Sequence, residues 1–281
     1  MMNVALQDLT PRFRVVAEYD AILSYAKEVS AALVGIVPSE QYRQYAEQIF
    51  VKMLAHCITL RLIAPDPARR TPAELWDLAS LSAIARSIVE TYDAMAYVAL
   101  GEVEPDEREF RLLLWELHGA SRRAKMLESI GSTDPRYLEI LATGTSLRER
   151  AIALPFFART SKTVQKKVED GDPPPFHLSQ RERCVAYRVN FDYYNAATMQ
   201  LSQYVHTLPL SIHQLFEFKA GTPEALHMMS LPLQHTLAFL SREIEGIRSL
   251  FPEVDTAPSA SVDTSIKVWS GVLERGVKSD A

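Results

Sequence analysis

The sequence predicts an all-α protein, a multi-helix bundle with a flexible C-terminal tail. Apolar residues recur at intervals of three and four along most of the 281 residues, as they do on one face of a helix. The ten glycines fall mainly between these segments, where turns and helix ends use them. Capping residues and prolines mark the ends of the expected helices, so each helix can be placed in order.

Three helices are expected in the first hundred residues. The first begins at Thr10-Pro11, a cap followed by a proline at a tolerated position, and extends to about residue 35. The second covers residues 38–64. The third begins at residues 71–74, where Thr-Pro-Ala-Glu combines a cap, a first-position proline and a capping-box glutamate, and it ends near residue 101. We expect this third helix to be central, because small or apolar residues flank its faces.

The middle of the chain predicts shorter helices and one clear loop. A fourth helix spans residues 105–130, and residues 134–169 split into two or three pieces because they contain Gly144 and Pro155. Consecutive prolines cannot continue a helix, so residues 171–175 form a loop that divides the sequence. We therefore expect one helical bundle over residues 1–253, with a subdivision open near residues 170–177.

The last third of the chain begins with a second capping box. Ser179 and Glu182 have its spacing and start a helix that reaches about residue 206. Another helix covers residues 222–251, kinked or divided by Pro232. Residues 254–265 are rich in Pro, Ser, Asp and Thr, which predicts a mobile linker, and residues 266–281 form a short C-terminal helix or a disordered tail. Trp269 in that tail either docks on a partner or folds back on the bundle, the more common arrangement.

Composition argues against several functional classes. The formal net charge is -5 and there is no basic tract, so charge does not support nucleic-acid binding, although it does not exclude it. Cys57 and Cys184 lie inside apolar helical segments, which indicates reduced thiols and a cytoplasmic protein. We expect no membrane association, because there is no leader peptide and no apolar run of about 18 residues.

The sequence lacks the residue spacings of the common cofactor-binding and metal-binding motifs. The sequence has no phosphate-binding loop, dinucleotide fingerprint, zinc-protease motif or esterase elbow. A di-iron bundle needs two Glu-x-x-His motifs, and only Glu224 and His227 have that spacing. We therefore expect no metal and no cofactor. Four other histidines have no convincing partner in the sequence, and we assign them no role: His56, His177, His213 and His235.

A polar stripe runs along one face of the expected third helix. This first polar stripe consists of Ser82, Arg86, Glu90, Asp93 and Tyr97. Arg86 and Glu90 are one turn apart and can pair. Such a pair either satisfies itself or serves catalysis, and the structural role is the more frequent one.

A second polar stripe follows the helix expected over residues 179–206. It consists of Arg188, Asp192, Asn195, Ser202 and His206. Most such stripes meet solvent, but this one can also form a pocket wall. If the two stripes face each other, Arg86, Glu90 and His206 are the catalytic candidates. The ligand-binding candidates are then Arg188, Asp192, Asn195 and Ser202.

The same two segments carry a resemblance to a family. Residues 82–92, together with Tyr194, Ser202 and His206, resemble an uncharacterised family of bacterial all-helical proteins. That family is a domain of unknown function with Arg-x3-Glu on a central helix, here Arg86 and Glu90, and a later Ser-x3-His. The resemblance covers about residues 40–240 and implies a helical fold in which both stripes act as a unit. It names no reaction.

A weaker likeness connects the expected fourth helix with HEPN-type helical bundles, in which an arginine and a histidine on one helix cleave RNA without a metal. Arg111 and His118 have a suitable spacing, although Leu112 stands where that group commonly has a polar residue. The leading functional hypothesis is a binding or regulatory module that self-associates, as in a homodimer, and whose polar stripes hold the central helices together or receive a small anionic ligand. The alternative is a metal-independent ribonuclease or other phosphate-ester hydrolase, with histidine as the acid-base group.

Overall fold

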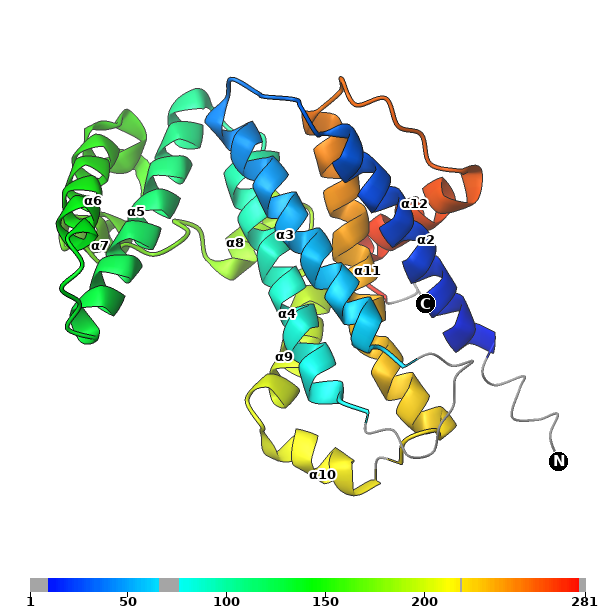
Figure 1. Ribbon diagram of the computed structural model, residues 1–281. Helices are drawn as coiled ribbons and strands as arrows, with labels where there is room; N and C mark the ends of the chain where they lie inside the picture. Colours follow the sequence, from blue (N-terminus) through cyan, green and yellow to red (C-terminus); the bar gives the residue numbers. More distant parts are fainter. Residues whose placement is uncertain (1–9, 66–75, 218, 278–281) are drawn as a thin grey trace, which may run out of the picture. The chain divides into compact units, whose positions relative to one another are not determined.

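The chain is helical throughout the parts that the structure describes. The computed structural model describes residues 10–65, 76–217 and 219–277, without the side chains of residues 10–13 and 215. These residues form eleven α-helices and two short helical turns and no strand, which confirms the all-α prediction (Figure 1). They divide into two compact units. Unit 2 is the continuous segment 96–183, and unit 1 consists of the residues before and after it.

Unit 1 is built on four long helices, α2 (Thr10–Ala32), α3 (Gln41–Ile63), α4 (Leu78–Met95) and α11 (Pro223–Leu250). Helix α11 packs against the other three (Figure 1). Burial of their inward apolar faces holds the helices together. The largest fully buried side chains of this core include Tyr19, Ile22, Phe50, Met53, Leu81 and Phe239.

Shorter helices complete unit 1. Helix α9 (Phe191–Val205) packs on α4, and α10 (Pro209–Glu217) packs on α9. Helix α11 is continuous through Pro232, so the proline does not divide the helix. The Pro232 carbonyl accepts a hydrogen bond from the Thr236 hydroxyl at 2.9 Å. No helix in the described residues is both long and apolar enough to cross a membrane.

The C-terminal helix begins earlier than the sequence suggests and docks on its own unit. Helix α12 (Ala260–Arg275) starts after the cap Ser259, so residues 260–265 of the expected linker are helical. It packs on α11 and α2, where the Trp269 indole donates to Glu18 at 3.3 Å. The tail helix therefore folds back on the chain's own bundle.

Unit 2 is a helical hairpin with a short third layer. Helix α5 (Pro105–Ser129) packs on α6 (Arg136–Ala153), followed by the 3-10 turn η2 (Pro155–Arg159) and α7 (Lys162–Glu169). The region 134–169 thus breaks into three pieces, but the breaks follow Ala153 and Arg159, and Gly144 lies inside α6. The apolar core of unit 2 contains Phe110, Leu113, Leu114, Leu117, Leu147, Ala151, Phe156, Phe157, Val164 and Val168.

Two expected helices end differently in the structure. The third expected helix passes at Ala96 into a π-helical turn, η1 (Ala96–Leu100), and its capping box at 71–74 lies outside the described residues. The helix expected over 179–206 has the capping box, since Ser179 N–H donates to the Glu182 carboxylate at 2.7 Å. It is nevertheless two helices, because α8 (Gln180–Ala186) ends before Arg188, whose φ of 53° is left-handed. Asn190 then caps α9 by accepting from Tyr193 N–H.

Candidate functional site

The first polar stripe is mostly structural. The Arg86 guanidinium donates to Glu90 at 3.0 Å, and the two side chains are 27% and 59% exposed. Ser82 and Asp93 are buried, and the Tyr194 hydroxyl of α9 donates to the Asp93 carboxylate at 2.7 Å. This hydrogen bond joins α4 to α9 through a residue of the apolar face of α9, and it involves no residue of the second polar stripe.

The second polar stripe does not stay together on one helix. Arg188 belongs to the turn before α9, so the helical projection that aligned it with Asp192 does not hold across that turn. Asp192, Asn195 and His206 are exposed, and the Ser202 hydroxyl donates to a carbonyl of its own helix at 2.7 Å. Within the described chain, no hydrogen bond or ion pair joins Arg86 or Glu90 to the second stripe. Their catalytic and ligand-binding roles stay predictions.

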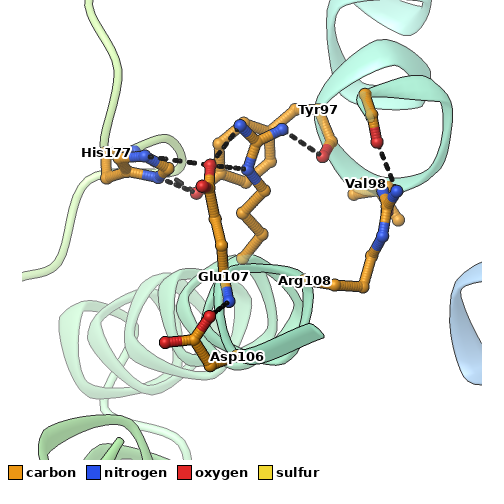
Figure 2. Close-up of polar contacts among 8 residues, drawn as sticks. Tyr97, Val98, Asp106, Glu107, Arg108 and His177 are labelled. Atoms are coloured by element: carbon orange, nitrogen blue, oxygen red, sulfur yellow. Dashed lines mark hydrogen bonds and ion pairs between the residues drawn. The ribbon is translucent and has the colours of Figure 1, made fainter. Parts of the chain in front are cut away.

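A polar cluster in unit 2 joins Tyr97 of the first polar stripe and Arg111 to Glu107 and His177, to which the sequence assigned no role. Figure 2 shows Tyr97, Glu107 and His177 turned toward one another. The Tyr97 hydroxyl lies 2.8 Å from His177 Nδ1, and His177 Nε2 faces Glu107 Oε1 at 3.8 Å. Arg111 binds the same Glu107 oxygen through Nε at 2.9 Å and Nη2 at 2.5 Å. Its guanidinium also lies 5.0 Å from the centre of the Tyr97 ring.

The environment of His177 keeps its ring neutral. Burial is the main cause that lowers the His177 pKa to about 4, and the charge of Arg111 acts in the same direction. The ring is packed between aromatic side chains, with ring centres at 5.4 Å from Phe156 and 5.8 Å from Phe110. His177 is therefore a polar anchor inside an aromatic core. The sequence could not reveal this, because its partners lie about 70 to 80 residues away.

Arg111 is poorly placed to bind a phosphate ester. Its side chain is 3% exposed and its charge is taken by Glu107. Withdrawing Arg111 would break this pair and leave the partly buried Glu107 carboxylate without its strongest partner. His118 donates from Nδ1 to the Pro173 carbonyl at 2.8 Å, so this ring fixes the backbone of the proline-rich segment.

A strap of residues 171–177 runs along α5. The Ser121 hydroxyl donates to the Gly171 carbonyl at 2.9 Å, and Lys125 donates to Asp172 at 2.7 Å. With the bond from His118 to Pro173, these contacts fall on successive turns of α5, and Glu107 faces His177 about three turns earlier on the same helix. The expected proline-rich loop is thus held on the helix from residue 107 to residue 125.

A cavity of about 210 Å³ lies between α5 and α6 beside this strap. It forms where the bulky core residues of the hairpin give way to small ones. A β-carbon added at Gly144 would lie 3.9 Å from the Ala120 β-carbon, so these two residues face each other across the helices. The lining is apolar between the helices and polar at the edge, and it consists of Leu117, Ala120, Ser121, Ala124, Lys125, Glu128, Tyr137, Ile140, Leu141, Gly144, Thr145, Arg148 and Gly171.

Unit 1 contains a second polar feature that the sequence analysis missed. Glu243 of α11 is fully buried, and neither carboxylate oxygen has a hydrogen-bond partner in the described residues. Burial raises the pKa of this carboxyl well above its usual value. Nearby, His235 is held by Gln200 at 2.9 Å, and burial lowers its pKa to about 4. Both groups lie on α11, within the packed bundle of unit 1.

Comparisons with known proteins found no match from which a function could be inferred. The sequence matches no protein family and no curated protein, and no solved structure matches the fold. In the described residues, no group of three His, Cys, Asp or Glu side chains is placed to hold a metal ion. The all-helical fold that the family resemblance implies is present, and the family itself stays a prediction.

Proposed function

We propose that this chain is a ligand-binding module whose site is the cavity between α5 and α6 of unit 2. The observation that carries the proposal is the cavity itself, which combines an apolar interior with a few polar groups at its edge. Small-molecule sites in helical proteins have this composition and commonly lie between helices. The leading hypothesis from the sequence, a binding module, is kept, while its site moves away from the two polar stripes.

The size of the cavity limits the ligand. A dry cavity of about 150 Å³ accepts benzene. At about 210 Å³ the α5–α6 cavity has room for one ring or a short acyl chain with a small substituent. Ala120, Ala124 and Gly144 create this space, because larger side chains at these positions would fill it.

The hydrolase alternative has less support. It needs an accessible arginine beside a histidine, whereas Arg111 is buried and paired and His118 is engaged by the strap. For the other candidates, no hydrogen bond or ion pair of the described residues joins Arg86 or Glu90 to His206. We also propose a cytoplasmic location, on the ground that both cysteines are free thiols. Membership of the bacterial helical family is proposed on the motifs at Arg86, Glu90, Ser202 and His206.

Binding of fluorobenzene, followed by fluorine NMR, tests the proposal. We expect saturable binding with a dissociation constant of about a millimolar, as suits a ligand of this size. Gly144→Leu fills the cavity and should abolish binding, and Ala124→Leu, from the opposite helix, should do the same. Ala142→Leu places the same side chain on the exposed face of α6 and should leave binding unchanged.

Circular dichroism of each variant shows whether the helices are kept. The proposal is overturned if the wild-type chain shows no saturable binding. It is also overturned if a folded Gly144→Leu or Ala124→Leu variant binds as well as the Ala142→Leu control.

A further inference from the structure

We propose that the ligand of the α5–α6 cavity carries an anionic group bound by Arg148 and Lys125, and that this group replaces Asp172 of the strap on Lys125. The inference rests on the proposed function and adds to it the chemical class of the ligand, a small amphipathic carboxylate or similar anion. It also assigns the strap a role in the control of the site.

Arg148 is the first cation of the proposed anion site. It lines the cavity from α6, and a β-carbon added at Gly171 would lie 3.6 Å from its Nη1, so the guanidinium lies beside the strap. Within the described part of the chain, Arg148 has no hydrogen-bond or ion-pair partner. A half-buried guanidinium at the edge of an apolar cavity is suited to bind a carboxylate.

Lys125 is the second cation of the proposed site, and it approaches the strap from α5. Its ammonium group binds Asp172, the residue after Gly171, at 2.7 Å. Because Arg122 also lies 3.3 Å from the Asp172 carboxylate, Asp172 keeps a cation when Lys125 turns to another anion. The Asp172 carboxylate thus occupies the position that a ligand carboxylate would take on Lys125.

The acidic group of the cavity lies far from Arg148. Ala120 faces Gly144 in the hairpin, so Glu128 falls near Tyr137, close to the turn between the helices, and Arg148 falls near Leu117. From Leu117 to Glu128 the helix rises about 16 Å, and Lys125, one turn before Glu128, is held by Asp172 of the strap. The separation of Arg148 from Glu128 orients an amphipathic anion with its charge toward Arg148.

Exchange on Lys125 links the ligand to the strap. The strap is fixed at Gly171 through Ser121, at Asp172 through Lys125 and Arg122, at Pro173 through His118 and at His177 through Tyr97. A ligand that takes Lys125 removes one of the two cations from Asp172 and leaves the other contacts. Ligand binding and the full set of strap contacts are then in competition, and a weaker hold on Asp172 reports that the site is filled.

The test compares two probes of nearly equal shape, 4-fluorobenzoate and 4-fluorobenzyl alcohol, on the full chain by fluorine NMR. We expect the benzoate to bind about tenfold more tightly, because a hydrogen bond to a charged group contributes about 1.5 kcal/mol or more. Arg148→Gln should remove this preference, so that the benzoate binds no more tightly than the alcohol. Arg123→Gln, an exposed cation of α5 outside the cavity lining, should keep the preference.

Asp172→Asn tests the competition directly. It removes the internal anion, so the affinity for 4-fluorobenzoate should rise about threefold or more while the affinity for the alcohol stays constant. Equal affinity for both probes, or no effect of Arg148→Gln, would overturn this inference while the proposed cavity site stands. If neither probe nor fluorobenzene binds, the proposed function itself fails. An unchanged benzoate affinity in Asp172→Asn would overturn the exchange on Lys125.

Discussion

Glu243 shows how a single residue can make the stability of a bundle depend on pH. Its carboxyl lies in the core with no hydrogen-bond partner among the described residues, and its charge would act on Cys57 and Tyr92, whose own pKa values are raised mainly by burial. The folded chain therefore favours the protonated form, and its carboxyl pKa is raised from the usual 4.5. Between pH 4.5 and the raised pKa, the folded state holds a proton that the unfolded state has lost, so stability falls as pH rises.

We therefore expect Glu243→Gln to stabilise unit 1 at neutral and alkaline pH. Relative to Glu243→Gln, the wild-type free energy of unfolding should fall by about 1.4 kcal/mol per pH unit above 4.5, until the folded-state pKa is reached. Glutamine carries no charge at any pH, so the variant lacks this contribution, while the opposite contribution of His235, whose pKa is lowered to about 4, is the same in both proteins. Urea unfolding at a series of pH values measures both slopes. Glu245→Gln on the same helix is the control and should keep the wild-type slope; equal slopes in all three proteins would contradict the argument.

The helix that was expected to carry the second polar stripe is divided at Arg188 into α8 and α9. The backbone at this residue is left-handed, with φ of 53°, and Val189 N–H returns to the Cys184 carbonyl at 2.8 Å. This is the way in which many helices end, and glycine is the residue that adopts this conformation with least strain.

We expect Arg188→Gly to be more stable than Arg188→Ala by about 1 kcal/mol. Both variants lose the same exposed side chain, so the difference isolates the backbone conformation at the turn. Thermal unfolding of the two variants measures it. If alanine is as stable as glycine, the turn between α8 and α9 is not left-handed at this position in solution.

Local signals predicted the elements better than they predicted the contacts between them. The capping box at Ser179 and Glu182 depends on four successive residues, so the sequence located it correctly. The break at Arg188 was missed because nothing in its residue type requires a left-handed backbone. Gly144 predicts a break in the helix, whereas in α6 it faces Ala120 and leaves room for a cavity. A pattern of small residues on two adjacent helices was the signal that could have found this site.

The candidate site was least accessible to sequence reasoning because it depends on distant pairs. His177 meets Tyr97 across 80 positions, and Lys125 meets Asp172 across 47. Helical projection reports which residues share a face of one helix, but it does not report what lies opposite. The paired Arg86 and Glu90 were recognised correctly for the same reason, since their contact lies within one turn.

At the scale of the whole molecule, α12 is part of the structure of unit 1. Its Ile266 and Leu273 are buried, and the Leu273 carbonyl accepts a hydrogen bond from Asn190 N–H at 2.8 Å. We expect truncation after Val254 to lower the unfolding midpoint and the solubility of the chain, because apolar surface of α2 and α11 becomes exposed. Thermal unfolding and size-exclusion chromatography measure both. An unchanged midpoint would favour a role of the tail in binding another protein.

The chain order of the two units has a consequence for synthesis. Unit 2 interrupts unit 1, and α11, which packs on α2, α3 and α4, is made only after unit 2 is complete. While the ribosome translates residues 96–222, the apolar faces of these three helices lack their covering helix. Unit 2 has its whole core once its own segment has emerged, so it can fold first. The unfinished unit 1 is then the part of the nascent chain that chaperones have to shield.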